Sequence, residues 1–357
     1  MRPVMPRLDR LLSGLLPGGL LLVLLLLPQI AAAARLHELS GRTMGTTWQV
    51  RVVSDAEPAR LRAGIQAQLD EVVAQMSTWE DGSDISRFNR ADAGSVHGLP
   101  AAFFEVLDAA LALAADTGGA YDPTVGPLVN LWGFGPDGER SAPPDDAAIA
   151  GVMARSGWQR LALDRRTRTV AQPGGLYLDL SSIAKGYGVD RVAGYLDGTG
   201  SEAWLVEVGG ELRSRGRKPD GLPWRVGIEQ PAPDDRRDAP ASGDEQPQLS
   251  GIVLEPDDLA VATSGDYRHY FETGQGRFSH TIDPRSGRPV THGLASVTVL
   301  HTSCMQADAL ATALTVLGPD AGYRYAVERG LAVLFFVHDG DGFQRRMTPA
   351  FERQLQP

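Results

Sequence analysis

Apolar side chains recur at helical spacing in two long stretches of the sequence. The stretch "PAAFFEVLDAALALAADTGG", residues 100–119, is amphipathic and ends at its glycines. In "PARLRAGIQAQLDEVVAQM", residues 58–76, one stripe of the expected helix collects Leu61, Ile65, Leu69, Val72, Val73 and Met76. Both stretches are therefore predicted to form helices that pack one face against a core.

Shorter runs rich in β-branched and aromatic residues are typical of strands. The first is "TTWQVRVV" at residues 46–53. Beyond residue 158 such runs dominate, at residues 176–180, 203–212, 224–230, 259–265, 277–283, 294–300 and 331–337. This mixture predicts the α+β class, with helices packed on mixed or antiparallel sheets.

The first 34 residues have a different pattern. Three arginines in "MRPVMPRLDR" precede the apolar stretch "LLSGLLPGGLLLVLLLLPQI", and "AAAAR" then offers small residues that suit cleavage. Residues 1–34 are therefore predicted to be an export signal peptide, cleaved near Ala33 or Ala34. An uncleaved N-terminal membrane anchor is the competing interpretation, because the apolar run is nearly long enough to span a bilayer.

Residues 35–357 are then the folded domain, long enough to bury one large core or two smaller ones. One segment of it, "PAPDDRRDAPASGDEQPQLSG", is rich in Pro, Asp and Ser and lacks aromatic residues. It falls between two strand-like runs. Residues 231–250 are therefore predicted to be a mobile surface insertion without chemistry of its own.

The charge and the cysteine content argue against three features: nucleic-acid binding, an internal disulfide and a lipid anchor. The formal net charge is −10 and the arginines are scattered, which argues against nucleic-acid binding, since phosphates require a basic face. Cys304 is the only cysteine, so no internal disulfide forms. Lipidation of the mature N-terminus is excluded as well, because it needs a cysteine at the cleavage site.

The segment "MQADALATAL" places Asp308 and Thr312 four residues apart in an almost apolar helical run that follows a strand end. At this spacing both oxygens lie on one helix face, so one bound group could touch both. A purely structural interpretation is also open. In it, Asp308 lies in the first turn and complements the helix dipole, while Thr312 bonds back to a carbonyl one turn earlier.

The segment "LYLDLSSIAKGYGVDRVAGYL" predicts a strand that ends at Leu180, followed by Ser181 and Ser182 as N-cap residues of a helix. The first turn of that helix would hold Lys185. A lysine there opposes the helix dipole unless an anion lies over the helix start, and a solvated lysine is the alternative. The nearby "GFGPDG" matches G-x-G-x-x-G only literally, because Pro136 cannot begin a dinucleotide-binding helix.

Three further segments carry candidate chemistry in turns. "RFSHTIDPRSGRPV" places His280 and Asp283 before a Pro-Gly turn, where a histidine can be a base, a ligand or a surface residue. "MSTWEDGSDISRFN" and "GGAYDPTVGPLVNLWGFG" contribute Trp79, Tyr121 and Asp122. An aromatic ring beside a carboxylate suits a planar heterocycle, although each segment alone also fits a core and loop role.

Taken together and in order, eight segments resemble the successive motifs of the ApbE family, the FAD:protein FMN transferases. They are "MGTTW", "MSTWEDGSDISRFN", "AYDPTVGPLVNLWGFG", "LDLSSIAKGYGVD", "VEVGGEL", "VATSGDY", "FSHTIDPRSGRPV" and "MQADALATAL". The resemblance covers about residues 40 to 340. It implies an ApbE-like, T-fold-like architecture within the α+β class.

The resemblance also implies a set of site residues. Those expected to hold FAD are Met44, Trp79, Ala120, Tyr121, Asp122, Asp179, Lys185 and Ile282. Magnesium would be bound by Asp308 and Thr312, with a contact from the loop at Ser182 to Ala184. His280 would lie near the scissile phosphate as a candidate base, and Lys185 would assist the reaction as a cation.

The implied reaction is magnesium-dependent transfer of FMN from FAD to a threonine hydroxyl of an exported redox protein, with release of AMP. Two alternatives stay open: a magnesium-dependent FAD pyrophosphatase that gives FMN and AMP, and a non-catalytic periplasmic FAD-binding protein. With the export signal, the resemblance places the chain in the periplasm, without the lipid anchor of many relatives. The acceptor or an uncleaved N-terminus would associate it with the inner membrane.

Overall fold

A computed structural model describes residues 34–138, 140, 142–231, 249–265, 270–273, 276–340 and 342–355. The predicted signal segment lies outside these residues except for Ala34, and so does most of the predicted insertion. The insertion's last two residues are an exception, because Leu249 and Ser250 already belong to a strand. None of the helices within the described ranges is long and apolar enough to cross a membrane.

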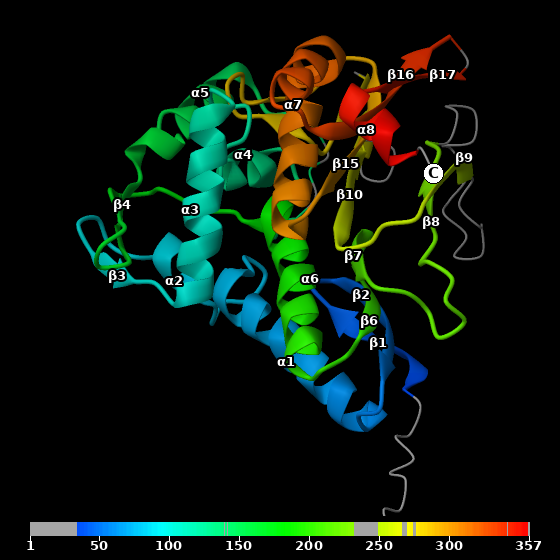
Figure 1. Ribbon diagram of the computed structural model, residues 1–357. Helices are drawn as coiled ribbons and strands as arrows, with labels where there is room; N and C mark the ends of the chain where they lie inside the picture. The colour runs from blue at the N-terminus through cyan, green and yellow to red at the C-terminus, as the bar shows by residue number, and fades with distance from the viewer. Residues whose placement is uncertain are drawn as a thin grey trace, which may run out of the picture. The chain divides into compact units, whose positions relative to one another are not determined.

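The centre of the fold is a sheet in which the described residues form eight strands, and all neighbouring pairs are antiparallel (Figure 1). The predicted α+β class is confirmed. In spatial order the strands are β1 (Arg35–Thr43), β2 (Thr46–Ser54), β6 (Ala203–Val208), β7 (Glu211–Arg215), β10 (Leu259–Gly265), β15 (Leu294–His301), β16 (Ala332–Asp339) and β17 (Gly342–Met347).

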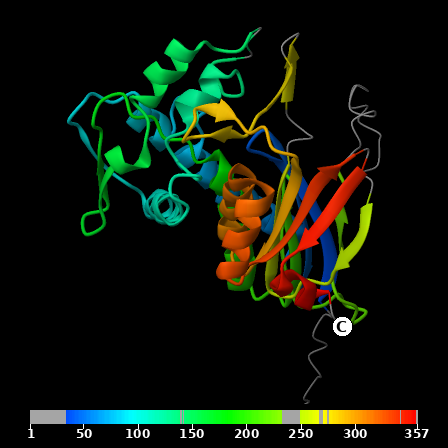
Figure 2. The same ribbon diagram turned by 90° about the horizontal axis from the view of Figure 1, so that it is seen from above.

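Helices cover one face of this sheet (Figure 2). The helices α6 (Ser181–Gly198) and α7 (Cys304–Glu328) pack on its central strands, and α1 (Pro58–Met76) packs against α6. The predicted helix at 58–76 is confirmed to the residue. The remaining helices are α2 (Asp84–Asn89), α3 (Ala101–Asp116), α4 (Gly126–Leu131), α5 (Asp146–Met153), the short 3-10 turn Trp158–Arg160, and α8 (Pro349–Gln354).

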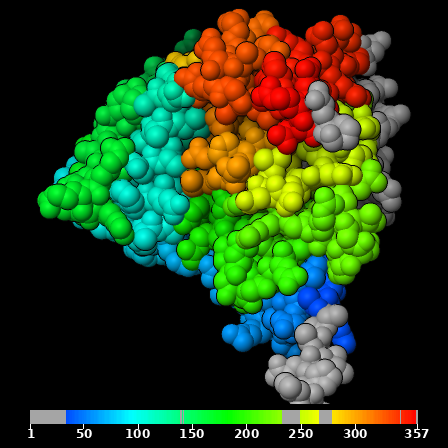
Figure 3. Space-filling view, viewed as in Figure 1, coloured from blue at the N-terminus to red at the C-terminus, as the bar shows by residue number. Residues whose placement is uncertain are grey.

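On the surface seen in Figure 3, α7 (orange) lies between α3 (cyan) and the C-terminal elements (red).

Smaller antiparallel pairings lie around the main sheet. The minor strands are β3 (Val96–Gly98), β4 (Ala162–Asp164) and β5 (Thr169–Ala171) in one group, and β8 (Val226–Glu229) with β9 (Leu249–Leu254), β11 (Tyr270–Thr273) with β12 (Gly276–Ser279), and β13 (Ile282–Asp283) with β14 (Arg288–Pro289) as pairs.

The continuous apolar runs of the central strands follow from burial of both sheet faces. In β16, Val333 and Phe335 belong to the core under the helices, whereas Leu334 and Phe336 belong to a core on the opposite face. The strands β8 and β9 and helix α8 contribute side chains to that second core. Side chains alternate across a strand, so both sets must be apolar.

The predicted strand at residues 176–180 is wrong, because the segment belongs to no strand. Side-chain amides satisfy the backbone groups of Leu176 and Leu178. Asn89 donates to the Leu178 carbonyl at 2.9 Å and accepts from the Leu178 N–H at 2.7 Å, and Gln172 bonds the Leu176 backbone in the same two-way manner. The alternating apolar pattern was real, because Leu176, Leu178 and Leu180 are fully buried.

Two other predicted strands are interrupted by turns. The run 203–212 forms the hairpin β6–β7, because Gly209 and Gly210 both take positive φ, as a tight turn requires. The run 277–283 divides into β12 and β13. The helix predicted after residue 303 passes an interruption at Gly318, followed by Pro319, and continues to Glu328.

Candidate active site

Two of the predicted site residues, Asp179 and Lys185, lie at the start of α6. Contrary to the sequence prediction, Ser181 and Ser182 are not caps. Leu180 is the N-cap residue, and the Asp179 carboxylate accepts a hydrogen bond from the Ser181 N–H at 2.9 Å. Lys185 is the fifth residue of α6 and so lies just beyond the first turn.

The start of α7 rules out the dipole explanation for Asp308. Ser303 caps the helix, and Asp308 is its fifth residue, so no acidic side chain lies in the first turn. Asp308 is 6% exposed, which a residue serving only the dipole would not need to be. Thr312 follows one turn later and is half-buried, and the bond back to a carbonyl is made by Thr315 instead.

Asp308 meets α6 at a glycine. The Gly186 N–H donates to Asp308 Oδ2 at 2.9 Å. Burial raises the pKa of Asp308, while Lys185 and the Gly186 N–H oppose that rise. Within the described residues, Oδ1 accepts no hydrogen bond, so a buried carboxylate keeps one oxygen for a further partner.

Lys185 pairs with a carboxylate that the sequence analysis did not single out. Its Nζ lies 2.6 Å from Oε1 of Glu211 at the start of β7. Glu211 is 3% exposed, and its Oε2 is buried without a hydrogen-bond partner. Burial and, next, the charge of Asp308 raise the pKa of Glu211, Lys185 opposes that rise, and the net result is a pKa of about 7.

Lys185 itself stays a cation at neutral pH. Burial alone would lower the pKa of its ammonium, but Asp308 and Glu211 outweigh that effect and hold the pKa above its ordinary value. One cation therefore lies between two buried carboxylates. This arrangement keeps positive charge fixed beside the start of α6.

Tyr121 adds a third segment to this cluster. Its hydroxyl accepts a hydrogen bond from Ser182 Oγ at 3.1 Å, and its side chain is 2% exposed. Burial raises the pKa of Tyr121, Ser182 opposes the rise, and the charges of Asp308, Asp179 and Asp122 add to it. The structure thus brings together predicted residues from the 120–122 loop, α6 and α7.

Asp122 orders the loop that carries Tyr121. Its Oδ1 accepts from the Thr124 N–H at 2.8 Å and from Thr124 Oγ1 at 2.7 Å, and its Oδ2 accepts from the Trp158 N–H at 3.2 Å. Burial raises the pKa of Asp122, and these hydrogen bonds oppose that effect. Ala120, two residues earlier, is buried at 1% exposure.

Met44 reaches α6 from the β1–β2 turn. It takes φ +48°, which costs a residue with a side chain about 1–2 kcal/mol, and its methyl group lies where it would touch any side chain at Gly188. Such backbone strain is often found at ligand sites. Ala184, the other small predicted residue of α6, is 7% exposed in the core.

Of the other predicted FAD and phosphate residues, Trp79 and His280 lie on loops and Ile282 lies in the short strand β13. Trp79 is 68% exposed in the loop after α1. Ile282 is 5% exposed and packs with Leu128 and Trp132 of the 128–132 segment. His280 is half-buried, with its ring 6.3 Å from that of Phe134 at 73°.

Glu211 could have been found from its pattern. In β7, Glu211 and Arg213 alternate with Leu212, so two charged side chains face the helices while Leu212 enters the core on the other face. Charged residues at alternate positions of a doubly buried strand indicate buried partners. The segment "VEVGGEL" carried that signal.

A metal at this site would need oxygens other than carboxylates. In the part of the chain that the structure describes, no three His, Cys, Asp or Glu side chains converge as a ligand set. The predicted set fits this condition, because it combines one carboxylate with a hydroxyl and the α6 segment. Hard oxygen ligands of this kind suit magnesium, which keeps several of its waters.

Known proteins are similar to this chain over most of its length. The family model described as "ApbE family" matches residues 44–335. An FAD:protein FMN transferase of Vibrio cholerae is 42% identical over 332 residues, which cover 92% of this chain and 96% of the relative.

Solved structures agree with that relationship. The apo form of the Pseudomonas stutzeri flavinyl transferase ApbE has a TM-score of 0.80 and 40% identity, and the match covers 90% of this chain and 98% of that one. The ApbE protein of Thermotoga maritima has a TM-score of 0.77 and 27% identity, covering 90% and 100%. The chain therefore belongs to the ApbE family.

Proposed function

We propose that this chain is an FAD:protein FMN transferase that requires magnesium, modifies a threonine hydroxyl and releases AMP. Relatives that match nearly the whole chain carry the transferase name. The observation that carries the chemical proposal is the junction of α6 and α7. There Asp308, with one oxygen unused, lies beside Lys185 and the Gly186 N–H.

The residues that would hold magnesium are Asp308 and Thr312, with Ser182 and Ala184 on the α6 side. Asp308 and Thr312 are one helical turn apart on one face of α7, so one ion can contact both oxygens. When bound, magnesium would neutralise charge on the pyrophosphate of FAD.

The start of α6 supports the phosphates in this proposal. Within the described residues the N–H groups of Ser181, Ile183 and Ala184 already have acceptors, which leaves that of Ser182 for a phosphate oxygen. The Lys185 ammonium adds a fixed charge there. Phosphoryl transfer depends mainly on such positioning and electrostatic stabilisation.

In the transfer step, the acceptor threonine oxygen attacks the FMN phosphorus in line. A new P–O bond forms, the bond to the bridging pyrophosphate oxygen breaks, and AMP leaves with that oxygen. His280 takes the proton of the threonine hydroxyl. Tyr121, Trp79, Ile282, Met44 and Asp179 would hold FAD around this centre.

The test is product analysis with FAD, MgCl2 and a purified acceptor protein. In-gel flavin fluorescence on the acceptor supports the proposal. Free FMN and AMP without labelled acceptor would indicate a pyrophosphatase, and unchanged FAD would indicate a binding protein. Replacing the acceptor threonine by valine must abolish the label.

We further propose that the protein acts in the periplasm and is not a lipoprotein. The N-terminal pattern of arginines, an apolar stretch and alanines supports this location. N-terminal sequencing of the exported protein should return Ala34 or Arg35. An intact Met1 terminus would favour the membrane anchor.

A further inference from the structure

Where helices α6 and α7 meet, an aspartate of each helix accepts hydrogen bonds from backbone N–H groups of the other. Asp308 of α7 accepts from the Gly186 N–H of α6, and Asp190 of α6 accepts from the N–H groups of Cys304 and Met305 at 3.1 and 3.0 Å. Asp190 lies one turn after Gly186, and Asp308 one turn after Cys304. The two contacts therefore form an antiparallel clasp between the helices, which we call the α6–α7 clasp.

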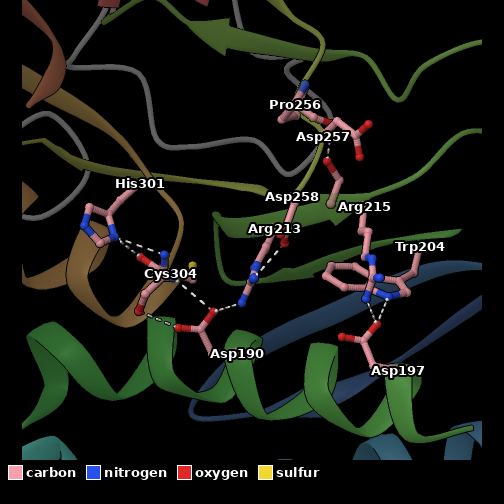
Figure 4. A network of polar contacts seen from close by, with 12 residues as sticks. Asp190, Asp197, Trp204, Arg213, Arg215, Pro256, Asp257, Asp258, His301 and Cys304 are labelled. Carbon is pink, nitrogen blue, oxygen red and sulfur yellow. Dashed lines mark hydrogen bonds and ion pairs between the residues drawn. The ribbon is translucent and has the colours of Figure 1, made fainter. Parts of the chain in front are cut away.

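Asp190 is the more heavily bonded half of this clasp. Ser303 Oγ donates to its Oδ2 at 2.8 Å, and Arg213 Nη1 donates to its Oδ1 at 2.9 Å. Arg213 also donates to Asp258 Oδ1 at 2.8 Å, so its guanidinium is held from two sides. Figure 4 shows Asp190 rising from α6 toward Cys304 on one side and Arg213 on the other.

These contacts fix where α7 begins relative to α6. The Asp190 oxygens receive four donors from two other elements, β7 and the first turn of α7. A helix held at its first turn cannot rotate or slide without breaking them. Because Asp308 lies one turn further along the same rigid helix, the same contacts determine whether Asp308 meets Gly186.

We propose that Asp190 is a positioning residue for the reaction, which holds α7 so that Asp308 stays against Gly186 and its free oxygen stays in the site. The proposal rests on the proposed function. Asp190 needs no contact with FAD or metal to act in this way. Partners that orient metal ligands commonly affect metal affinity by about 10–100-fold.

Asparagine at position 190 tests the role with little change in shape. Asn offers one acceptor oxygen, and its NH2 group would face N–H donors that have lost their partner. Asp197 provides the matched control, because it lies on the same helix, accepts from Trp204 Nε1 at 2.9 Å and forms an ion pair with Arg215 Nη1 at 2.9 Å. Both of its partners are on β6 and β7, so it does not touch α7 (Figure 4).

The experiment compares wild type, Asp190→Asn, Asp197→Asn and Ser303→Ala by two measurements. The first is hydrogen exchange at the Gly186 amide. The second is the apparent dissociation constant for MgCl2, from the rise in unfolding temperature. We expect Asp190→Asn to speed Gly186 exchange at least about tenfold and weaken magnesium binding about 10–100-fold. Asp197→Asn should change neither by more than about twofold.

Unchanged exchange at Gly186 in folded Asp190→Asn would overturn the proposal, as would equal effects of Asp190→Asn and Asp197→Asn on magnesium. If Asp190→Asn does not fold, Ser303→Ala decides, because it removes one donor to Asp190 and should shift both measurements in the same direction but less. If MgCl2 does not raise the unfolding temperature of wild type, the magnesium requirement in the proposed function is wrong. Faster Gly186 exchange in Asp190→Asn would then still support the positioning role.

Discussion

Gly186 and Asp308 lie so close together that any side chain at position 186 would force the two helices to shift. A Cβ atom there would lie 2.8 Å from the Asp308 Cβ and 2.3 Å from the Cys304 carbonyl oxygen. Both distances are far below normal contact. The absence of a side chain therefore lets the Gly186 N–H reach the Asp308 carboxylate.

Gly186→Ala should push α6 and α7 apart. We expect it to lower the free energy of unfolding by about 1–3 kcal/mol, as overpacking does, and to slow FMN transfer on the order of 10²-fold. Gly194→Ala is the control, because a Cβ at this α6 position meets open space. It should raise stability by about 0.5–1 kcal/mol and leave transfer unchanged. Urea unfolding and transfer rates measure both effects.

Asp308→Asn should remove the negative charge that is proposed to bind magnesium while keeping the side-chain shape. Transfer should be lost and partly restored at high magnesium, because the ligand is weakened and the fold is kept. Thr312→Val should show a milder defect of the same kind, and Thr312→Ser should stay active. Transfer rates measured against MgCl2 concentration decide this. Superimposable curves for wild type and Asp308→Asn would exclude Asp308 as a ligand.

Glu211→Gln should change how stability depends on pH. The pKa of Glu211 is raised from 4.5 to about 7, so between these values the native state holds a proton that the unfolded state lacks. Stability from this group is present below pH 4.5 and is lost as pH rises through about 7. Relative to Glu211→Gln, wild type should therefore lose stability over that window. Urea unfolding in EDTA at several pH values tests it, and parallel profiles would contradict the assignment.

His280→Ala should slow transfer by about 10²–10⁴-fold if His280 is the base for the acceptor hydroxyl. Binding of FAD should remain, because the flavin contacts proposed above lie elsewhere. Fluorescence titration of FAD and single-turnover transfer separate the two effects. An equal loss of FAD affinity would make His280 a substrate-positioning residue instead.

Asn89→Ala should destabilise the fold although the residue lies outside the proposed reaction centre. Both Leu178 backbone groups would lose their partner, and each buried unsatisfied group costs about 1–3 kcal/mol. Urea denaturation at fixed pH measures the loss. A change below about 0.5 kcal/mol would mean that the extended segment finds other partners.

Local patterns predicted most of the secondary structure. The stripe in residues 58–76 and the run in 294–300 depend only on side-chain spacing and composition, and both elements formed there. The segment at 176–180 has the same alternation as a strand. No pattern of apolar residues could reveal that Asn89 and Gln172 would bond its backbone instead of a neighbouring strand.

The sequence predicted which residues make up much of the candidate site, but only part of how they contact one another. Asp308 and Lys185 were found from motif resemblance, and the structure brings them to one junction. The role of Gly186 was not visible in the sequence, because it depends on how closely α7 approaches. Asp190 was missed for a similar reason, because its partners come from other elements, whereas the alternation of charged residues in β7 could have indicated Glu211.

The α6–α7 clasp also sets the order in which a newly made chain can become active. Gly186 and Asp308 are 122 residues apart, and Asp190 and Cys304 are 114 apart. Contacts between such distant segments form late, because loop closure must precede them. A nascent chain that has emerged only as far as β10 would hold α6 and Lys185 but not the Asp308 carboxylate that the Gly186 amide contacts. The proposed reaction centre is therefore completed only after α7 has been synthesised and has packed against α6.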